Sequence, residues 1–362
     1  MEIYISNRLF YLAWGLVTLF FVYKLILEVY TYILSILIAY ILLKLYAKKF
    51  KNKIKIKGQA VLITGCDTGL GHDAALRLAS IGFNVFAGCL TPDGVGVNTL
   101  REKGGETLHV VPLDVTSDTS VKDALEVVKR KSPDAGLWAV INNAGIAFNG
   151  DVEIASIETM KRIAEVNIYG MIRVTQACLP LIRKSKGRII NVTSVKGRLA
   201  IPTDAPYTMT KWAGEALSDS LRREMYRFGV NVIIIEPGHF GGITGMLTNE
   251  SGKLATENLE EAWHNASSNV KSVYGRQYID GLINNIRHVG EGGATNTEPV
   301  SDAMQDAVEN VSPKYRYLVH GTNSSFDKYC VLAVLNQVLP EVVMDWLVRY
   351  TFPLPRTTEQ NN

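Results

Sequence analysis

Three side chains between residues 191 and 211 have the types and spacing needed to take a proton from an alcohol: Ser194, Tyr207 and Lys211. If a helix begins after Pro206, Tyr207 and Lys211 lie one turn apart on one face, so an ammonium approaches a phenol. A phenol with a pKa of about 10 is a poor base at neutral pH, but a nearby cation favours its charged form. The spacing therefore predicts general-base chemistry, with Ser194 hydrogen bonding the same substrate oxygen.

A glycine-rich turn predicts a dinucleotide beside these groups. Gln59 to Ile63 reads as a buried strand, and a helical pattern runs from His72 to Ser80. Glycines between them would let the backbone approach a pyrophosphate, whose charge the helix N-terminus would stabilise. The cofactor-binding residues predicted in this turn are Gly65, Asp67, Gly69, Leu70 and Gly71.

The segment after the next predicted strand, Asn84 to Ala87, should lie near the adenosine ribose. An acidic residue there indicates NAD and a basic one NADP, but Gly88, Cys89 and Leu90 follow. Asp67, with no Arg or Lys between Phe83 and Asn98, would repel a 2′-phosphate. We therefore expect NAD, with NADP as the alternative.

Other predicted strand ends carry polar or small residues that suit the same cofactor. Leu108 to Asp114 ends in an acid suited to the adenine amino group, and Leu137 to Asn142 runs into a turn of small residues. Asn231 to Glu236 and Arg316 to His320 read as further strands. The cofactor-binding residues predicted at these ends are Asp114, Asn143, Ala144, Gly145, Pro237 and Gly238, besides Tyr207 and Lys211.

Two uncharged apolar runs, Leu9 to Tyr23 and Val29 to Leu43, lie near the N-terminus. As a helix, each would reach only about 22 Å, short of a hydrocarbon core of about 30 Å. Either both runs span a membrane as a tight hairpin, or one extended run spans it while the other lies at the interface. Seven lysines and no acid lie between Lys44 and Lys57. This pattern predicts a retained anchor with the following domain in the cytosol.

Charge and cysteine content narrow the partners. Without those seven lysines the formal net charge falls from +3 to −4. A mildly acidic globular part argues against nucleic acid, whereas the lysine strip suits anionic lipid head groups. The cysteines, at positions 66, 89, 178 and 330, show no metal-ligand spacing and fit a reduced compartment, so no metal is expected.

The order and spacing of these motifs resemble the short-chain dehydrogenase/reductase superfamily over roughly residues 58–350. The motifs are Thr64-Gly-x-x-x-Gly-x-Gly71, Asn142-Asn-Ala-Gly145, Ser194, Tyr207-x-x-x-Lys211 and Pro237-Gly238. Within the superfamily, the Gly-Cys-Asp-Thr-Gly turn, Phe86 to Leu90, Gly136 to Gly145 and Tyr274 to Tyr278 resemble one branch. That branch holds estradiol 17-beta-dehydrogenase type 2, retinol dehydrogenases and D-beta-hydroxybutyrate dehydrogenase.

The resemblance implies an α/β Rossmann fold, a doubly wound parallel sheet with ligands at the carboxyl ends of its strands. It implies that Tyr207 accepts the proton, that Lys211 binds the nicotinamide ribose and lowers the tyrosine pKa, and that Ser194 orients the substrate oxygen. Asn167 would complete a water relay, although a polar residue in the helical stretch Met160 to Val174 also fits a helix-kinking core position. The implied reaction is reversible hydride transfer between an alcohol and a nicotinamide.

We expect a hydrophobic anchor at 1–50, a basic linker at 51–57, the catalytic domain at 58–326 and an apolar C-terminal cap at 327–362. Between Phe240 and Ser312, glycine breaks at 241–242, 275 and 290–293 suggest a mobile lid. The apolar tail would cap a pocket or touch the bilayer, or else pack on its own domain.

The leading expectation is a membrane-anchored, NAD-dependent dehydrogenase of a lipophilic alcohol such as a steroid or retinoid. A short 3-hydroxy acid is the alternative substrate, because Lys196 and His239 could reach a carboxylate, although both also fit ordinary loop positions. A third hypothesis is a non-catalytic dinucleotide-binding scaffold. We expect the endoplasmic reticulum, with a mitochondrial membrane as the alternative, and a homodimer is compatible with the sequence.

Overall fold

The computed structural model describes residues 2–49, 52–132, 136–244, 249–288, 293–322 and 326–358. Of residues 2–13, 44–49 and 249–252 it describes the backbone only. The chain divides into two compact units, Met1–Lys53 and Ile54–Asn362.

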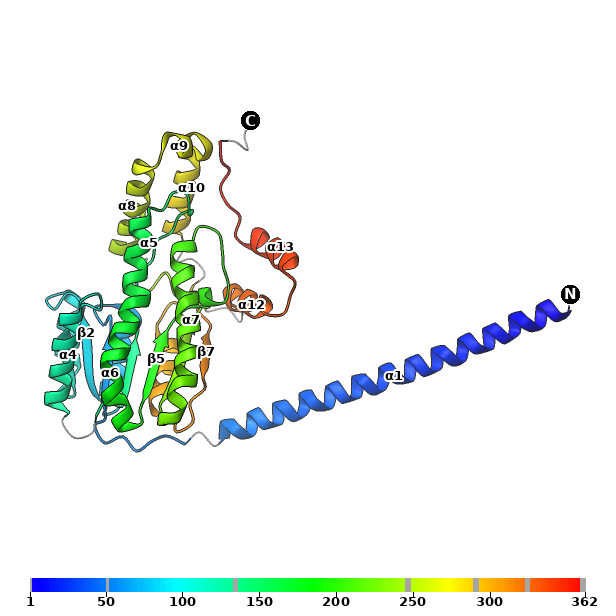
Figure 1. Ribbon diagram of the computed structural model, residues 1–362, viewed down its shortest axis with the longest axis horizontal. Coiled ribbons are helices and arrows are strands. Elements are labelled where there is room, and N and C mark those ends of the chain that lie inside the picture. Colours follow the sequence, from blue (N-terminus) through cyan, green and yellow to red (C-terminus); the bar gives the residue numbers. More distant parts are fainter. Residues whose placement is uncertain are drawn as a thin grey trace. The chain divides into compact units, whose positions relative to one another are not determined.

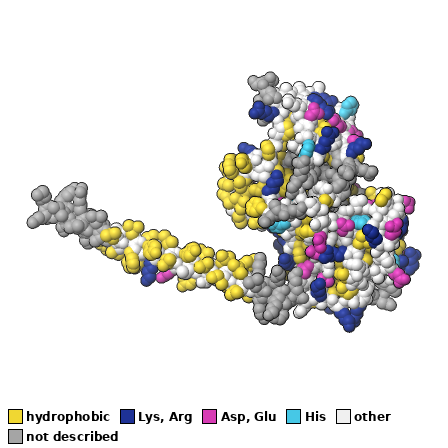
Figure 2. All heavy atoms as spheres, turned by 180° about the vertical axis from the view of Figure 1, so that it is seen from behind, with side chains coloured by type: hydrophobic (Ala, Val, Ile, Leu, Met, Phe, Trp, Pro, Cys, Tyr) yellow, Lys and Arg dark blue, Asp and Glu magenta, His cyan; other side chains and the backbone are white. Residues whose placement is uncertain are grey.

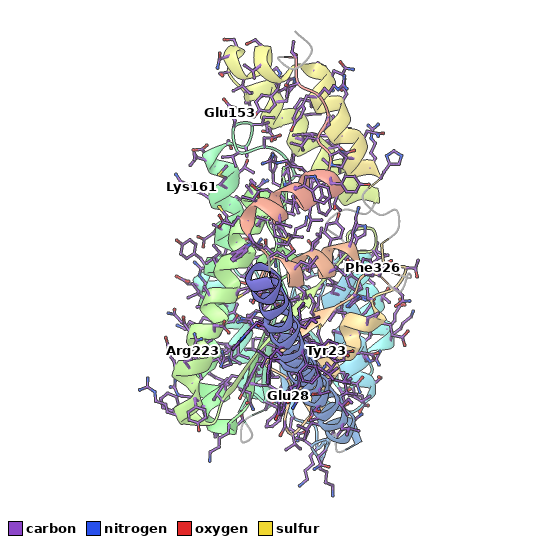
Figure 3. All side chains as sticks on the ribbon, turned by 90° about the vertical axis from the view of Figure 1, so that its right-hand side faces the viewer. Tyr23, Glu28, Glu153, Lys161, Arg223 and Phe326 are labelled. Carbon is purple, nitrogen blue, oxygen red and sulfur yellow. The ribbon has the colours of Figure 1, made fainter. Side chains whose placement is uncertain are left out.

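Among its described residues, the first unit contains one helix, α1 (Glu2–Lys49). Its segment Trp14–Leu43 has a mean hydropathy of 2.1 and no buried residue, and the side chains of Tyr23 and Glu28 are among those it exposes (Figure 3). At 1.5 Å per residue a helix of this length is about 45 Å long, enough to cross a hydrocarbon core of about 30 Å.

The tight hairpin that the two apolar runs allowed is therefore wrong. The runs form one helix because the residues that separate them, Lys24 to Glu28, include no Gly or Pro. In the lysine strip, the side chains of 44, 48 and 49 and the whole of residue 51 lie outside the described part of the chain. So do residues 289–292, which include most of one predicted glycine break.

The second unit is built on a seven-stranded sheet in the order β3-β2-β1-β4-β5-β6-β7 (Figure 1). All six strand pairs are parallel, which confirms the predicted doubly wound fold. The strands are β1 (Ala60–Thr64), β2 (Asn84–Cys89), β3 (Leu108–Pro112), β4 (Ala139–Asn142), β5 (Arg188–Val192), β6 (Asn231–Pro237) and β7 (Arg316–Val319). Most predicted bounds hold within two residues, but Asp114 lies beyond the end of β3.

Helices cover both faces of the sheet, and the alternation of side chains along each strand assigns them. Val61 and Ile63 face α2 (Gly69–Ser80), α3 (Val95–Lys103) and α11 (Glu298–Glu309). Ala60 and Leu62 face the other layer, which consists of α4 (Asp118–Lys131), α6 (Met171–Ser185) and α7 (Ala205–Met225).

A helical lobe stands beyond one end of the sheet (Figure 1). It contains α5 (Ile157–Ala164), α8 (Asn249–Asn265), α9 (Ser268–Tyr274) and α10 (Arg276–Arg287). A separate apolar cluster that includes Phe148, Ile163, Leu259 and Ile283 forms its core. Its helices α8, α9 and α10 fall in the region 240–312 that was expected to form a lid, whereas α5 precedes that region.

The C-terminal helices α12 (Lys328–Leu335) and α13 (Glu341–Thr351) have two different faces. Their inner face packs with Val195 and Leu199, next to Ser194. With this face the tail packs on its own domain, which was one of the alternatives expected for it. Their outer face is an exposed apolar patch (Figure 2), which comprises Val334, Val338, Val342, Val343, Trp346, Tyr350 and Leu354.

The folded body begins earlier than the expected boundary at residue 58. The backbone N–H of Ile54 donates to the carbonyl of Glu309 (2.8 Å), and Ile56 packs against the core. The second half of the expected linker 51–57 is therefore part of the second unit, because its two isoleucines are partly buried against the core of that unit.

Candidate active site

One cavity of about 630 Å³ lies at the carboxyl ends of the central strands. Parallel α/β sheets bind ligands at this edge, where the strand order reverses between β1 and β4. Nearly all residues predicted for the site line it, namely Gly65, Asp67, Gly69, Leu70, Asp114, Asn143, Ala144, Gly145, Ser194, Tyr207, Lys211, Pro237 and Gly238. Gly71 and Asn167 are the two predicted residues that do not.

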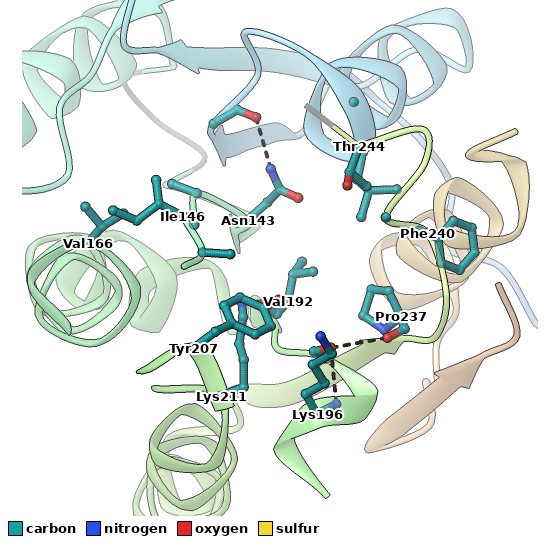
Figure 4. A pocket seen from close by; sticks show the side chains of 18 of the residues that line it. Asn143, Ile146, Val166, Val192, Lys196, Tyr207, Lys211, Pro237, Phe240 and Thr244 are labelled. Atoms are coloured by element: carbon teal, nitrogen blue, oxygen red, sulfur yellow. Dashed lines mark hydrogen bonds between the residues drawn. The ribbon is translucent and has the colours of Figure 1, made fainter. Parts of the chain in front are cut away.

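Helix α7 positions the expected base. It begins at Ala205 with Pro206 in its first turn, so Tyr207 and Lys211 share one buried face. The Lys211 Nζ atom lies 5.3 Å from the centre of the Tyr207 ring and donates to the Val192 carbonyl (3.1 Å) (Figure 4). The Ser194 hydroxyl donates to the Pro237 carbonyl at 3.5 Å. The structure thus brings together Ser194, Tyr207 and Lys211, as their spacing predicted.

The electrostatics of the pair differ from the expectation. Burial raises the pKa of Tyr207 well above its ordinary value, Asp204 raises it further, and a hydrogen bond with Ser194 only partly offsets this. Burial also lowers the pKa of Lys211 to about 8. The prediction that the Tyr207 pKa is lowered does not hold for the protein without a bound cofactor. The side chain is only 7% exposed, so its charged form is poorly solvated.

Asn167 lies one layer behind the cavity, in a π-helical segment (Glu165–Gly170) between α5 and α6. Its carboxamide accepts from the Ile146 N–H and donates to the Ile146 carbonyl and the Thr210 hydroxyl, all at 2.9 Å. It therefore ties the segment that follows the Asn-Ala-Gly turn to α7. Single π turns inside helices are frequent at functional sites, and no periodicity in the sequence predicted this one.

The turns after β1 and β4 are clamped together. The Thr64 hydroxyl accepts from the N–H groups of Asn143 and Ala144, both at 3.0 Å. In return the Asn143 amide donates to the carbonyls of Thr64 and Gly65, both at 3.0 Å. Asn143 thus shapes the cavity from behind. Sequence reasoning did not predict a role for Thr64, although the residue opens the glycine motif.

The glycine turn fits a dinucleotide pyrophosphate. Helix α2 begins at Gly69, three residues before its predicted start, with no side-chain cap and no acid in its first turn. Its first N–H groups therefore have no side-chain partner and favour a bound anion. Gly65 and Gly69 have φ angles of 69° and 64°, which favour glycine.

Two predicted acids bind backbone groups beside the expected adenosine position. The Asp67 carboxylate accepts from the N–H groups of Thr91 (2.8 Å) and Leu90 (3.0 Å), which fastens the glycine turn to the end of β2. The Asp114 carboxylate accepts from the backbone N–H and the hydroxyl of Thr116, at 2.8 and 2.7 Å. Both side chains remain on the cavity wall.

Lys196 does not behave as a solvated loop lysine. Its side chain is 21% exposed, lines the cavity and forms an ion pair with the buried carboxylate of Asp204. Its Nζ atom lies 5.6 Å from the centre of the Tyr207 ring. Asn149 donates to the other Asp204 oxygen (2.5 Å). Sequence reasoning missed Asp204 and Asn149, although Asp204 stands only three residues before Tyr207.

His239, the other expected carboxylate partner, also lines the cavity. Its ring packs 5.0 Å from that of Tyr329, a residue of α12 on the same wall.

Gly71→Ala is expected to distort the cofactor cradle. A Cβ atom there would stand 2.4 Å from the Asn143 amide nitrogen and 2.5 Å from the Gly65 carbonyl oxygen. We expect a loss of about 1–3 kcal/mol in the free energy of unfolding, measured by thermal denaturation, together with weaker NADH binding. Gly94→Ala is the matched control, since the nearest atom to its Cβ would be the Thr91 carbonyl oxygen, at 3.4 Å. Equal effects of the two substitutions would contradict this account.

Comparison with known proteins agrees with this geometry. The family model "short chain dehydrogenase" matches residues 59–255. D-beta-hydroxybutyrate dehydrogenase of Bos taurus is 42% identical over 72% of this chain and 77% of that protein. 17-beta-hydroxysteroid dehydrogenase type 6 of Homo sapiens is 37% identical over 83% of this chain and 90% of that protein. Retinol dehydrogenase 16 of Rattus norvegicus is 35% identical over 90% of this chain and 98% of that protein.

A solved short-chain dehydrogenase from Streptomyces avermitilis shares the fold, with a TM-score of 0.62 at 21% identity over 82% of this chain and 97% of that one. The chain therefore belongs to the short-chain dehydrogenase family and is an NAD(P)-dependent oxidoreductase that interconverts an alcohol and a carbonyl group.

Proposed function

We propose that this enzyme acts on a lipophilic alcohol or ketone, such as a steroid or retinoid, with NAD, at a membrane surface. One observation carries the proposal: the cation beside Tyr207, Lys196, is already paired with Asp204. A substrate carboxylate would have to break this ion pair, whereas an uncharged substrate would leave it intact.

One part of the cavity wall suits an apolar molecule. Pockets of roughly 300–1,000 Å³ accept drug-sized ligands, and this one measures about 630 Å³. The apolar part of this wall consists of Ile146, Ala147, Val166, Val195, Phe240, Leu254, Ala255 and Tyr329, and the polar part away from the expected cofactor consists of Asn149, Arg162, Lys196, Asp204, His239, Thr244 and Asn258.

The protein's own groups divide the work as follows. The α2 N-terminus and the glycine turn would hold the pyrophosphate, and Lys211 would bind the nicotinamide ribose. When bound, the nicotinamide accepts or gives the hydride. Ser194 orients the substrate oxygen, Tyr207 takes its proton on oxidation and returns it on reduction, and Asn167 fixes the Ile146 carbonyl for a proton relay.

Two apolar surfaces support membrane lipids as partners. The segment Trp14–Leu43 of α1 is long and apolar enough to anchor the chain. Exposed apolar patches of the kind found on α12 and α13 mark contacts with lipid or with another protein, so a second copy of the chain would also suit this face. Tyr329 connects the cavity to the inner face of these helices, since it lines the cavity and its ring packs 5.0 Å from that of Phe352.

Lipophilic substrates partition into membranes, so an anchor would raise their local concentration. We propose the endoplasmic reticulum membrane, with the catalytic domain in the cytosol, and the lysines that follow the anchor support this orientation. A mitochondrial membrane is the alternative, since the Bos taurus relative is named as mitochondrial.

The second candidate is a 3-hydroxy acid dehydrogenase. The relative at 42% identity is named for D-beta-hydroxybutyrate, and both Lys196 and His239 line the cavity. Under this candidate, Lys196 would exchange Asp204 for the substrate carboxylate.

Tyr207→Phe is expected to lower kcat by roughly 10²–10⁴-fold, because the proton then has no acceptor. NADH binding, measured by fluorescence titration, should change little. Tyr226→Phe is the control, since that phenol is 85% exposed and lies outside the cavity lining. Undiminished turnover by Tyr207→Phe would favour a scaffold or a different base.

A substrate panel separates the two candidates. With NAD, we expect turnover of estradiol or retinol and little of D-3-hydroxybutyrate. Asp204→Asn should raise the ratio of kcat/KM for the acid to that for the lipid by roughly tenfold, because it frees the Lys196 charge. Asp118→Asn, on the surface, should leave this ratio unchanged. Turnover of the acid alone by the unmodified chain would overturn the lipid proposal.

NADH is expected to bind at least roughly tenfold more tightly than NADPH, because a 2′-phosphate would meet the Asp67 carboxylate with no cation on the β2–α3 segment. Asp67→Asn should narrow the difference, whereas Asp93→Asn, exposed in the same segment, should not. The two dissociation constants come from fluorescence titration. Tighter binding of NADPH would reject NAD as the preferred cofactor.

A further inference from the structure

Helix α7 carries a third buried polar side chain in line with the active-site pair. Tyr207, Lys211 and Glu215 follow one another at four-residue intervals and are all buried. Glu215 is 7% exposed and does not line the cavity. A carboxylate this deep in the protein requires partners, and three other elements supply them.

The first partner is the turn that carries Ser194. The Thr193 hydroxyl donates to one Glu215 oxygen at 2.5 Å, and its other contact is the Ile235 carbonyl at 3.2 Å. Two residues beyond Val195, a Cβ atom on Gly197 would stand 2.8 Å from the Glu215 Cγ and 3.1 Å from the Lys211 carbonyl oxygen. The turn therefore lies directly on α7, between Lys211 and Glu215.

The second partner is Arg316 on β7, whose guanidinium forms an ion pair with Glu215. It also reaches Asp219, one turn further along α7, at 2.7 Å, and Glu236 at 3.1 Å. Arg316 therefore joins α7 to the edge of the sheet.

Glu236 extends the network back to the Ser194 turn. It is fully buried at the end of β6 and accepts from Arg198, which follows the turn, at 2.5 Å. The next residue, Pro237, supplies the carbonyl that accepts from Ser194. The ion network thus reaches both sides of the catalytic serine.

We infer that Glu215 is a positioning residue of the active site. Through Thr193, Gly197 and Arg316 it fixes the Ser194 turn on the helix of Tyr207 and Lys211, and it supplies the buried negative charge that holds Lys211 as an ammonium.

The charges around Lys211 and Glu215 determine the direction in which the Lys211 pKa changes when Glu215 is replaced. Burial lowers the pKa of Lys211 to about 8, and the Glu215 carboxylate opposes this. Burial and Glu236 raise the pKa of Glu215 to about 6, against the Thr193 hydrogen bond and Arg316. Glu215 is therefore charged above this pH, and removing its charge lowers the pKa of Lys211 further. Lys211 would then lose its proton at a lower pH.

The test follows NADH binding, which needs no alcohol substrate. The full-length chain in detergent micelles is titrated with NADH by fluorescence, at pH values on both sides of the Lys211 pKa of about 8. For Glu215→Gln, we expect the pH at which affinity falls to drop by about one unit. Asp219→Asn is the matched control, because it removes an Arg316 partner without touching Thr193, and its profile should match that of the unmodified chain.

Glu215→Asp separates charge from reach. This variant keeps the negative charge, so the pH dependence of its NADH affinity should match that of the unmodified chain. Its shorter side chain should lose the hydrogen bond from the Thr193 hydroxyl, which should lower kcat for the alcohol found in the substrate panel. A Glu215→Gln profile equal to that of the unmodified chain, or a uniform loss of affinity at every pH, would overturn the inference. If Glu215→Gln does not fold, the inference is tested on Glu215→Asp alone. A change in the pH dependence of its NADH affinity, or an unchanged kcat, would then overturn the inference.

The inference rests on the proposed role of Lys211 at the nicotinamide ribose. If no alcohol in the panel is turned over, the proposed substrate fails while the NADH profile still tests Glu215.

Discussion

The hydrogen bonds between Thr64 and the turn after β4 hold the two strands where the order of the sheet reverses. One hydroxyl accepts from two successive backbone N–H groups, and Asn143 returns two bonds to the turn after β1. A crevice can open at this point only because the neighbouring chains leave in opposite directions, and the clamp sets its width. The glycine turn, the start of α2 and the small residues at 144 and 145 are all placed by it.

Burial governs the chemistry on the other side of the crevice. Tyr207 and Lys211 are both held in a setting that disfavours their charged forms. The protein stabilises these groups with neighbours that are themselves buried, such as the Val192 carbonyl and the Ser194 hydroxyl. Such a site has a low effective dielectric, so a charge added or removed nearby acts more strongly than it would in water. The tyrosine cannot therefore be described by its distance to the lysine alone.

The sequence predicted the sheet and most of the cavity lining because both depend on local patterns. Apolar strands alternate with helices, and each glycine or small residue at a strand end has a local steric reason. The continuous α1 helix was not predicted, because the charges between its apolar runs were given more weight than the absence of a helix breaker. Lys196 was weighed as a loop residue because its partner, Asp204, is brought to it by the fold. The Glu215 network was missed for the same reason, since its members lie on α7, β6, β7 and the Ser194 turn.

The π-helical segment between α5 and α6 contains one more residue than an α-helix would need to cover the same turn. At 3.6 residues per turn, deleting one residue here would rotate one helix relative to the other by about 100°. Either α5 would leave the helical lobe or Asn167 would turn away from Ile146. The length of this stretch is therefore constrained as strictly as its composition, and insertions or deletions would be tolerated in the surrounding loops but not here.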